Sequence, residues 1–201
     1  ETTYPKIKFK SLVADFSNYE SGVKVISEKI QNPDLDIKIF IVNAGYGIFD
    51  PFISLKNNKI HDFIYTMCTS YAQLAREFII KNKTTIYNST NNKCLLYFTS
   101  SALADMPSPQ STLYCGVKSY DSALARHISI EKYGKGLDIT AMQPGLFSNS
   151  KFFGNNSQNS NIQKLLPTSD EVCDCVMKTL GKATIVDCSF NALFGRVFLW
   201  I

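Results

Sequence analysis

Residues 37–45 read Ile-Lys-Ile-Phe-Ile-Val-Asn-Ala-Gly, an almost continuous apolar run that ends in a turn of small residues. Such a run is typical of a strand in the middle of a parallel sheet, where helices cover both faces. A second run of the same kind, Cys94–Thr99, is followed by Ser100-Ser101. In parallel sheets ligands bind at the carboxyl ends of the strands, so the residues that follow these two runs are the first candidates for a site.

The segments around these two runs alternate between helical and strand-like patterns. Helices are predicted at 19–31, at about 55–81, at about 113–133 and from the capping signal Thr168-Ser-Asp-Glu171 to about residue 180. Further strands are predicted at 8–14, 137–142 and 183–187, and the polar stretch 82–92 is interpreted as a loop. The alternation predicts an α/β fold with a parallel sheet and crossover connections.

Composition limits the classes of function. The chain has 201 residues, of which 45% are hydrophobic and 19% charged, with a net charge of +4. This mild excess, without a basic run, argues against a nucleic-acid partner, and no apolar stretch approaches the ~18 residues of a membrane helix. Cys173-x-Cys175 is not a zinc-binding spacing, so no metal site is expected. We expect one domain over residues 1–201.

One group of residues predicts chemistry. Tyr114 and Lys118 are four apart at the start of a predicted helix and share one of its faces, and Ser101 ends the preceding strand. A phenol has a pKa of about 10, and a nearby ammonium lowers it, so Tyr114 could exchange a proton with a substrate oxygen that Ser101 also binds. A Tyr-x-x-x-Lys pair also occurs by chance on solvated helix surfaces, and the strand-end serine is what favours the catalytic interpretation.

Together with their spacing along nearly the whole chain, these residues resemble the short-chain dehydrogenase/reductase family. The resemblance implies a Rossmann-like doubly wound parallel sheet and an enzyme that uses a nicotinamide cofactor. It also implies that Tyr114 is the general acid, that Lys118 lowers the pKa of Tyr114 and holds the nicotinamide ribose, and that Ser101 orients the substrate carbonyl. The remaining matches imply further cofactor contacts: Asp15 near the adenine, Asn43-Ala44-Gly45 beside the cofactor, and Pro144-Gly145 at the nicotinamide.

Finer features resemble the branch that contains 17-beta-hydroxysteroid dehydrogenase type 12 and the very-long-chain 3-oxoacyl-CoA reductases. These include the Val-Ala-Asp-Phe start, the Pro-x-Pro before Tyr114, Thr69-x-x-x-Gln73-Leu74, and Thr-Ser-Asp-Glu followed by Val-Met-Lys-Thr-Leu-Gly. That branch implies NADP(H) rather than NAD(H), a lipid-like ketone (a 3-oxoacyl-CoA or a steroid) and a role in lipid metabolism such as fatty acid elongation. It also implies association with the endoplasmic reticulum membrane, with the cytoplasm as the alternative. A homodimer is a separate expectation. The loop 146–166 would cover an apolar substrate. The alternative is that its aromatic residues pack in the hydrophobic core.

The chain also departs from the family pattern. The glycine-rich Thr-Gly-x-x-x-Gly-x-Gly turn is absent, so we expect a fold that lacks the first strand–helix unit or units. The family's helix asparagine would fall near Ile64 and Tyr65, and a hydroxyl residue after Pro-Gly near Asn149, where Ser148 or Ser150 could replace it. Three alternatives stay open: a fragment of a longer reductase of lipid-like ketones, a degenerate protein that has lost cofactor binding, or a reductase of sugars, retinoids or small ketones.

Overall fold

The computed structural model describes residues 7–88, 93–131, 135–148 and 166–188. Four parallel strands form one sheet in the order β1-β2-β3-β4. They are β1 (Ile39–Val42), β2 (Cys94–Thr99), β3 (Leu137–Gln143) and β4 (Ile185–Asp187). Because consecutive strands are parallel neighbours, each connection has to cross over the sheet, and it does so through helical structure. The predicted α/β fold with a parallel sheet is confirmed.

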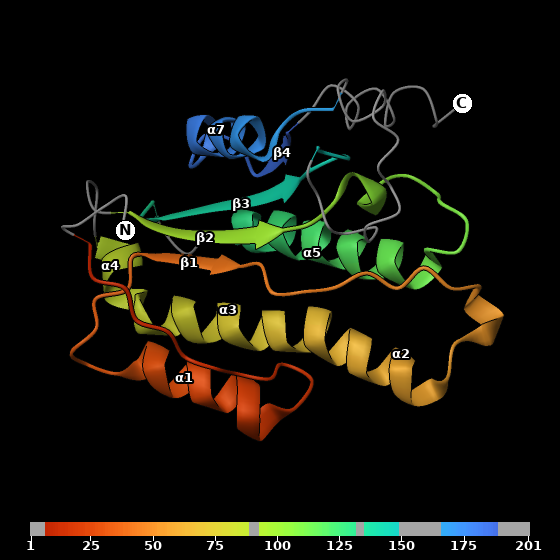
Figure 1. Ribbon diagram of the computed structural model, residues 1–201. Coiled ribbons are helices and arrows are strands. Elements are labelled where there is room, and N and C mark those ends of the chain that lie inside the picture. The colour runs from red at the N-terminus through yellow and green to blue at the C-terminus, as the bar shows by residue number, and fades with distance from the viewer. Residues whose placement is uncertain (1–6, 89–92, 132–134, 149–165, 189–201) are drawn as a thin grey trace.

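Helices lie on both sides of this sheet (Figure 1). They are α1 (Lys24–Gln31), α2 (Asn57–Ile64), α3 (Ser70–Lys81), α4 (Lys83–Asn88), α5 (Thr112–Ile130) and α7 (Ser169–Thr179). A π-helical turn precedes α1 at Tyr19–Val23, and another, Tyr65–Thr69, joins α2 to α3. Short 3-10 turns lie at Phe52–Ser54 and Ala102–Ala104.

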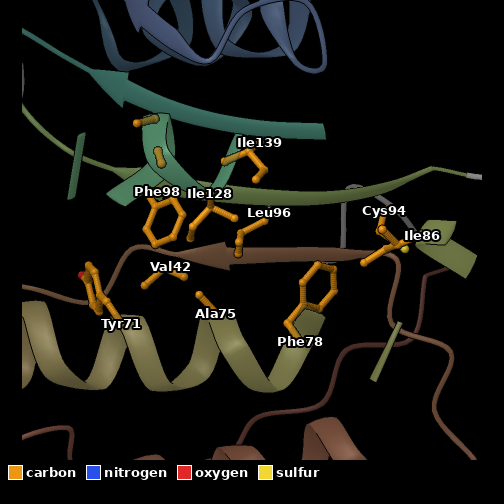
Figure 2. Packing of buried hydrophobic residues seen from close by; sticks show 12 residues of the cluster. Val42, Tyr71, Ala75, Phe78, Ile86, Cys94, Leu96, Phe98, Ile128 and Ile139 are labelled. Atoms are coloured by element: carbon orange, nitrogen blue, oxygen red, sulfur yellow. The ribbon is translucent and has the colours of Figure 1, made fainter. Parts of the chain in front are cut away.

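The main hydrophobic core lies between the sheet and the pair α3 and α5. Tyr71, Ala75 and Phe78 of α3 point toward Val42 of β1 and the apolar residues of β2, and Ile128 of α5 packs into the same cluster (Figure 2). On the other face α7 contributes a smaller cluster, in which Val172 packs with Val186 of β4. The apolar runs recognised in the sequence therefore form strands because these helices bury them.

Strand β1 is covered on one face only within the described residues. Val42 is 4% exposed, whereas Ile39 and Ile41 are 58% and 59% exposed. Successive side chains of a strand point to opposite faces, so this alternation means that α3 covers one face of β1 while the other stays open. β1 is also the edge of the sheet on this side.

The predicted strand at residues 8–14 is wrong. Residues 7–15 have no regular secondary structure, and Val13 is 94% exposed. A strand needs a neighbour for its backbone hydrogen bonds, and in the sheet described here β1 pairs with β2 alone.

The predicted loop at residues 82–92 is also wrong in part, because Lys83–Asn88 form α4. Ile86 is fully buried in the main core, and its backbone N–H donates to the carbonyl of Asn82 at 2.9 Å. One buried apolar side chain outweighs the polar composition of its neighbours, which is a tertiary effect that local pattern does not report.

Candidate active site

Ser101 and Tyr114 come from two different elements that meet above the end of β2. Ser101 begins the 3-10 turn after that strand, with extended backbone, and its Oγ accepts a hydrogen bond from the N–H of Leu103 at 3.2 Å. Tyr114 lies in the first turn of α5. A hydrogen bond joins the two side chains, and both residues are largely buried, at 8% and 6% exposed. The structure therefore brings together the serine and the tyrosine that the sequence singled out.

Lys118 lies one turn further along α5 and is turned back toward the sheet. Its Nζ donates to the carbonyl oxygen of Thr99, the last residue of β2, at 2.6 Å. The same Nζ is 5.9 Å from the ring centroid of Tyr114 and 6.0 Å from that of Tyr71 on α3. The ammonium thus sits between two aromatic rings and the strand end, next to the predicted phenol.

A carboxylate that the sequence reasoning did not single out completes this cluster. Asp121 lies three residues after Lys118, and its Oδ2 is 3.3 Å from Lys118 Nζ. The side chains of Lys118 and Asp121 are 5% and 0% exposed. The i, i+3 spacing of the two residues on one helix could have indicated the contact, but spacing alone does not tell a buried pair from a surface pair.

The pKa of Tyr114 moves in the direction opposite to the prediction. Burial raises the pKa of Tyr114 to about 12, the hydrogen bond from Ser101 lowers it, and the charge of Asp121 raises it. The sequence predicted that the ammonium of Lys118 would lower this pKa. Burial of the phenol outweighs that effect, and the ammonium is itself paired with Asp121.

The turn Asn43-Ala44-Gly45 lies against Met67 of the π-turn and Tyr71 of α3, whose ring also contacts Lys118. The Thr99 hydroxyl donates to Asn43 Oδ1 at 2.8 Å, and the Tyr71 hydroxyl donates to the carbonyl oxygen of Ala44. A Cβ on Gly45 would lie 2.8 Å from the terminal methyl group of Met67, so a larger residue here would require the Met67 side chain to shift. This exposed turn is therefore fixed at the carboxyl edge, beside the Lys118 cluster.

Pro144-Gly145 follows β3 and reaches the same edge. The carbonyl oxygen of Pro144 accepts a hydrogen bond from the N–H of Ala102 at 2.9 Å, which places this turn directly beside Ser101. The two predicted turns and the Ser101–Tyr114 pair thus lie at the ends of three adjacent strands. Ser148 is described and bonds to the Pro167 carbonyl, whereas Asn149, Ser150 and residues 149–165 of the predicted substrate loop lie outside the described residues.

Asp15 occupies the turn before α1 and does not follow a strand. Its carboxylate accepts hydrogen bonds from the backbone N–H and the hydroxyl of Ser17, at 2.9 and 2.7 Å. These bonds lower the pKa of Asp15. They are local bonds of a turn, and its predicted place near an adenine stays a prediction.

The π-turn Tyr65–Thr69 decides which residues of the central helix face the cluster. The sequence placed the family's helix asparagine near Ile64 and Tyr65. Ile64 is 40% exposed, and Tyr65 packs beside the cluster of Val23, Ile30 and Leu74, so neither residue faces Lys118. Cys68 lies on the π-turn itself. Burial raises the pKa of Cys68 to about 12, and the charges of Asp121 and Lys118 both act on it. The extra residue of a π-turn rotates the helix face, which counting along the sequence does not detect.

Ser100 fixes α5 to the sheet beneath the site. Its hydroxyl donates to the backbone carbonyl of Lys118 at 2.7 Å and lies 2.7 Å from the hydroxyl of Ser122. Gln143 of β3 then donates to Ser122 at 2.9 Å. These buried hydrogen bonds hold α5 at a fixed distance from β2 and β3. They thereby also fix the positions of Tyr114 and Lys118 on that helix.

The fold and the site together define a Rossmann-like α/β protein with a serine, a tyrosine and a lysine at the carboxyl edge of its sheet. Residues 2–161 match the family of short chain dehydrogenases, so the chain belongs to this family of oxidoreductases. Two uncharacterized oxidoreductases of Schizosaccharomyces pombe are each 25% identical to it over 131 residues, which cover 65% of this chain and 52% of each relative. The match thus spans about half the length of these relatives.

Solved structures of similar fold lead to the same architecture. A short-chain dehydrogenase from Sphingobium yanoikuyae in complex with NADPH superposes with a TM-score of 0.75 at 16% identity, covering 90% of this chain and 68% of that chain. A 7beta-hydroxysteroid dehydrogenase gives 0.78 at 16% identity, with 92% and 69% covered. The bulky-bulky ketone specific alcohol dehydrogenase from Comamonas testosteroni gives 0.73 at 17% identity, with 90% and 65% covered. At these sequence identities, the structural similarity shows that this chain shares the fold of these proteins.

No described helix is both long and apolar enough to span a membrane. In the same parts of the chain, no group of three or more His, Cys, Asp or Glu residues is arranged to hold a metal ion.

Proposed function

We propose that this protein reduces a ketone or 3-oxo group on a lipid-like substrate, with a nicotinamide cofactor and with Tyr114 as the general acid. The observation that carries the proposal is the Ser101–Tyr114 hydrogen bond at the carboxyl edge of the sheet, with Lys118 Nζ 5.9 Å from the Tyr114 ring. The similar protein structures that carry nicotinamide cofactors support it, as does the family.

The side chains have complementary roles in this reaction. The raised pKa keeps the Tyr114 phenol protonated at neutral pH, so it has a proton to give to the substrate oxygen. Ser101 can hydrogen-bond the same oxygen and hold it at the phenol. A bound nicotinamide supplies the hydride, because no side chain carries one. After the proton has left, the ammonium of Lys118 stabilises the phenolate.

The residues present fit the nicotinamide end of such a cofactor. Residues 43–45 form an exposed turn at the end of β1, and Pro144-Gly145 follows β3 on the far side of β2. Asn43-Ala44-Gly45 and Pro144-Gly145 would border the cofactor, with Tyr114 and Lys118 at its ribose and Asp15 toward the adenine. The sequence has no glycine-rich turn of the kind that holds a pyrophosphate.

The finer identity of the reaction is part of the same proposal. The resemblance to the branch of 17-beta-hydroxysteroid dehydrogenase type 12 favours a 3-oxoacyl-CoA or a steroid as substrate and NADP(H) over NAD(H). It also favours association with the endoplasmic reticulum membrane. A homodimer is a separate expectation. Cell fractionation and sedimentation of the tagged protein test these last two points, and recovery only as a monomer in the cytoplasm would remove them.

Consumption of NADPH with a long-chain 3-oxoacyl-CoA tests the reaction. It is measured for the 201-residue chain and for a chain extended at its amino end by a glycine-rich strand–turn–helix unit. In whichever chain is active, Tyr114→Phe is expected to lower kcat at least about 100-fold. Tyr87→Phe, an exposed tyrosine of α4, serves as the control and is expected to leave kcat unchanged. Activity that survives Tyr114→Phe would remove Tyr114 from the mechanism.

A second candidate is a non-catalytic member of the family. The observation that favours it is that the ammonium of Lys118 is already bonded to Thr99 and Asp121, while the pKa of Tyr114 is raised. Calorimetry with NADPH separates the two candidates: no binding and no turnover, even in the extended chain, would favour this one. A panel of sugars, retinoids and small ketones tests the third class of substrate.

A further inference from the structure

Asp121 is a buried charged residue to which the proposed reaction gives no role. Its side chain is fully buried on α5, and its Oδ2 contacts Lys118 Nζ at 3.3 Å. Its other oxygen, Oδ1, has no hydrogen-bond partner among the residues that the structure describes. Lys118 is therefore the contact that accounts for a carboxylate at this place.

Lys118 in turn needs a counter-ion. Removal of an amine from water favours its neutral form, and burial does lower the pKa of Lys118. The charge and the hydrogen bond of Asp121 act in the opposite direction and raise it. An amine that loses its proton loses the charge with which it could act on Tyr114. The distance and the burial of the pair thus give Asp121 a direct effect on the site.

The geometry points to Asp121 as a positioning residue that keeps Lys118 charged and holds its ammonium between Thr99, Tyr71 and Tyr114. This inference rests on the proposed function, because it assigns Asp121 a part in the same site. Two directed contacts fix the ammonium, one to the Thr99 carbonyl at 2.6 Å and one to Asp121 at 3.3 Å. If Asp121 is removed, the hydrogen bond to the neutral Thr99 carbonyl is the one that remains among the residues that the structure describes.

Within the described parts of the chain, the other titratable groups that act on the pair come from three elements. They are Cys68 on the π-turn, Tyr71 on α3, and Tyr114 and Tyr120 on α5 itself. Burial raises the pKa of each of them, so all four are neutral between pH 6 and 9. In that range a change in the proton affinity of Lys118 is due to Asp121.

Competitive acetylation of the 201-residue chain tests the inference without cofactor or substrate. Trace acetic anhydride labels neutral amines, and peptide mass spectrometry follows Lys118 from pH 6 to 11. In Asp121→Asn, the pH of half-maximal labelling of Lys118 is expected to fall by about one unit, which gives about tenfold more labelling at pH 8. Asp121→Glu keeps the charge and is expected to restore most of the wild-type profile. Asp138→Asn, which removes the partner of Lys93, is the matched control and leaves the Lys118 profile unchanged.

A second measurement covers the case in which Asp121→Asn does not fold. Lys118→Met leaves the Asp121 carboxylate buried without its partner, so adding Asp121→Asn to Lys118→Met is expected to raise the urea midpoint. An unchanged labelling profile in Asp121→Asn, or a double variant less stable than Lys118→Met, would overturn the inference.

These outcomes are separable from failure of the proposed function. If the labelling profile shifts while the extended chain reduces no ketone, the reductase proposal fails and Asp121 remains the counter-ion of Lys118. If the extended chain is active, Asp121→Asn is expected to move the pH profile of kcat, which loss of a merely structural ion pair would not do. An active enzyme whose pH profile is the same in Asp121→Asn would contradict the inference alone.

Discussion

The two ends of the sheet each carry a lysine–aspartate pair, and the two pairs differ mainly in burial. At the amino end, Lys93 and Asp138 bridge β2 and β3 at 3.1 Å, with side chains 49% and 25% exposed. At the carboxyl end, Lys118 and Asp121 are 3.3 Å apart, with side chains 5% and 0% exposed. The same chemistry at nearly the same distance is therefore a surface contact at one end and a part of the candidate active site at the other.

This difference follows from the solvation of the charges. Water and salt screen an exposed pair, which contributes about 0–1 kcal/mol. A buried pair gives up the hydration of both ions, so each partner depends on the other and loss of one leaves an uncompensated charge. Burial thus turns a weak contact into a strong mutual dependence, and this dependence is what makes the pKa values of the carboxyl-end pair sensitive to each other.

The largest expected effect on stability comes from removing the lysine of the buried pair, compared with removing the lysine of the exposed pair. Lys118→Met is expected to destabilise the protein by about 3 kcal/mol at pH 8, because the Asp121 carboxylate then has no partner. Lys93→Met is expected to cost less than about 1 kcal/mol. Urea unfolding followed by circular dichroism measures both. Equal costs for the two variants would show that the difference in burial has no energetic consequence.

The next effect is a pH dependence that the buried Asp121 is expected to produce. Burial raises the pKa of Asp121 from 3.8 to about 7, so the folded state holds this proton more tightly than the unfolded chain does. The stabilisation is present below about pH 4 and is lost as the pH rises through 7. Between pH 4 and 8 the wild type is therefore expected to lose about 2–4 kcal/mol relative to Asp121→Asn.

Unfolding titrations at four pH values between 4 and 8 check this difference. Asp138→Asn is the control at the amino end: it keeps Asp121, so it is expected to lose stability between pH 4 and 8 as the wild type does. A wild type and an Asp121→Asn variant whose stabilities run parallel across the range would show that Asp121 does not titrate in the folded protein.

A smaller effect tests how the buried pair is held over the strands. Ser100→Ala removes the hydroxyl that bonds the Lys118 carbonyl and Ser122, and is expected to cost about 1–2 kcal/mol. Ser129→Ala, at an exposed position of the same helix, removes a hydroxyl bonded to the Arg126 carbonyl and is expected to cost less than about 0.5 kcal/mol. Thermal unfolding measures both, and an equal shift would remove Ser100 as the anchor of α5.

The smallest effect is the response to salt. A double-mutant cycle between Lys93 and Asp138 is expected to give a coupling of about 0.5 kcal/mol that approaches zero in 1 M NaCl. The coupling between Lys118 and Asp121 is expected to change little, because ions do not reach it. A salt-sensitive coupling at the buried pair would mean that water enters the site.

Much of this architecture could be predicted from the sequence because strong local patterns carry it. The apolar runs 37–42 and 94–99, the helical periodicity of 113–133 and the Thr168 capping box each correspond to an observed element. Ser101, Tyr114 and Lys118 were found because a strand end and a helix start place them at one edge. These are local signals, and the topology of a parallel sheet gathers them at one place.

What could not be predicted depends on burial and on the rotation of helix faces. The sequence shows that Asp121 is three residues from Lys118, but not that both are buried. It places the family's helix asparagine near Ile64 by counting, whereas the π-turn directs Cys68 and then Tyr71 toward the cluster. The direction of the pKa shift of Tyr114 was wrong for the same reason, since burial of the phenol is a property of the folded chain.

The open face of β1 has a consequence for handling the protein. Ile39 and Ile41 are exposed beside a row of backbone donors and acceptors at the edge of the sheet. Such an edge recruits strands from other molecules and nucleates precipitation in concentrated samples. Solubility during purification should thus respond to a charged residue at position 41, whose side chain lies on the open face of β1.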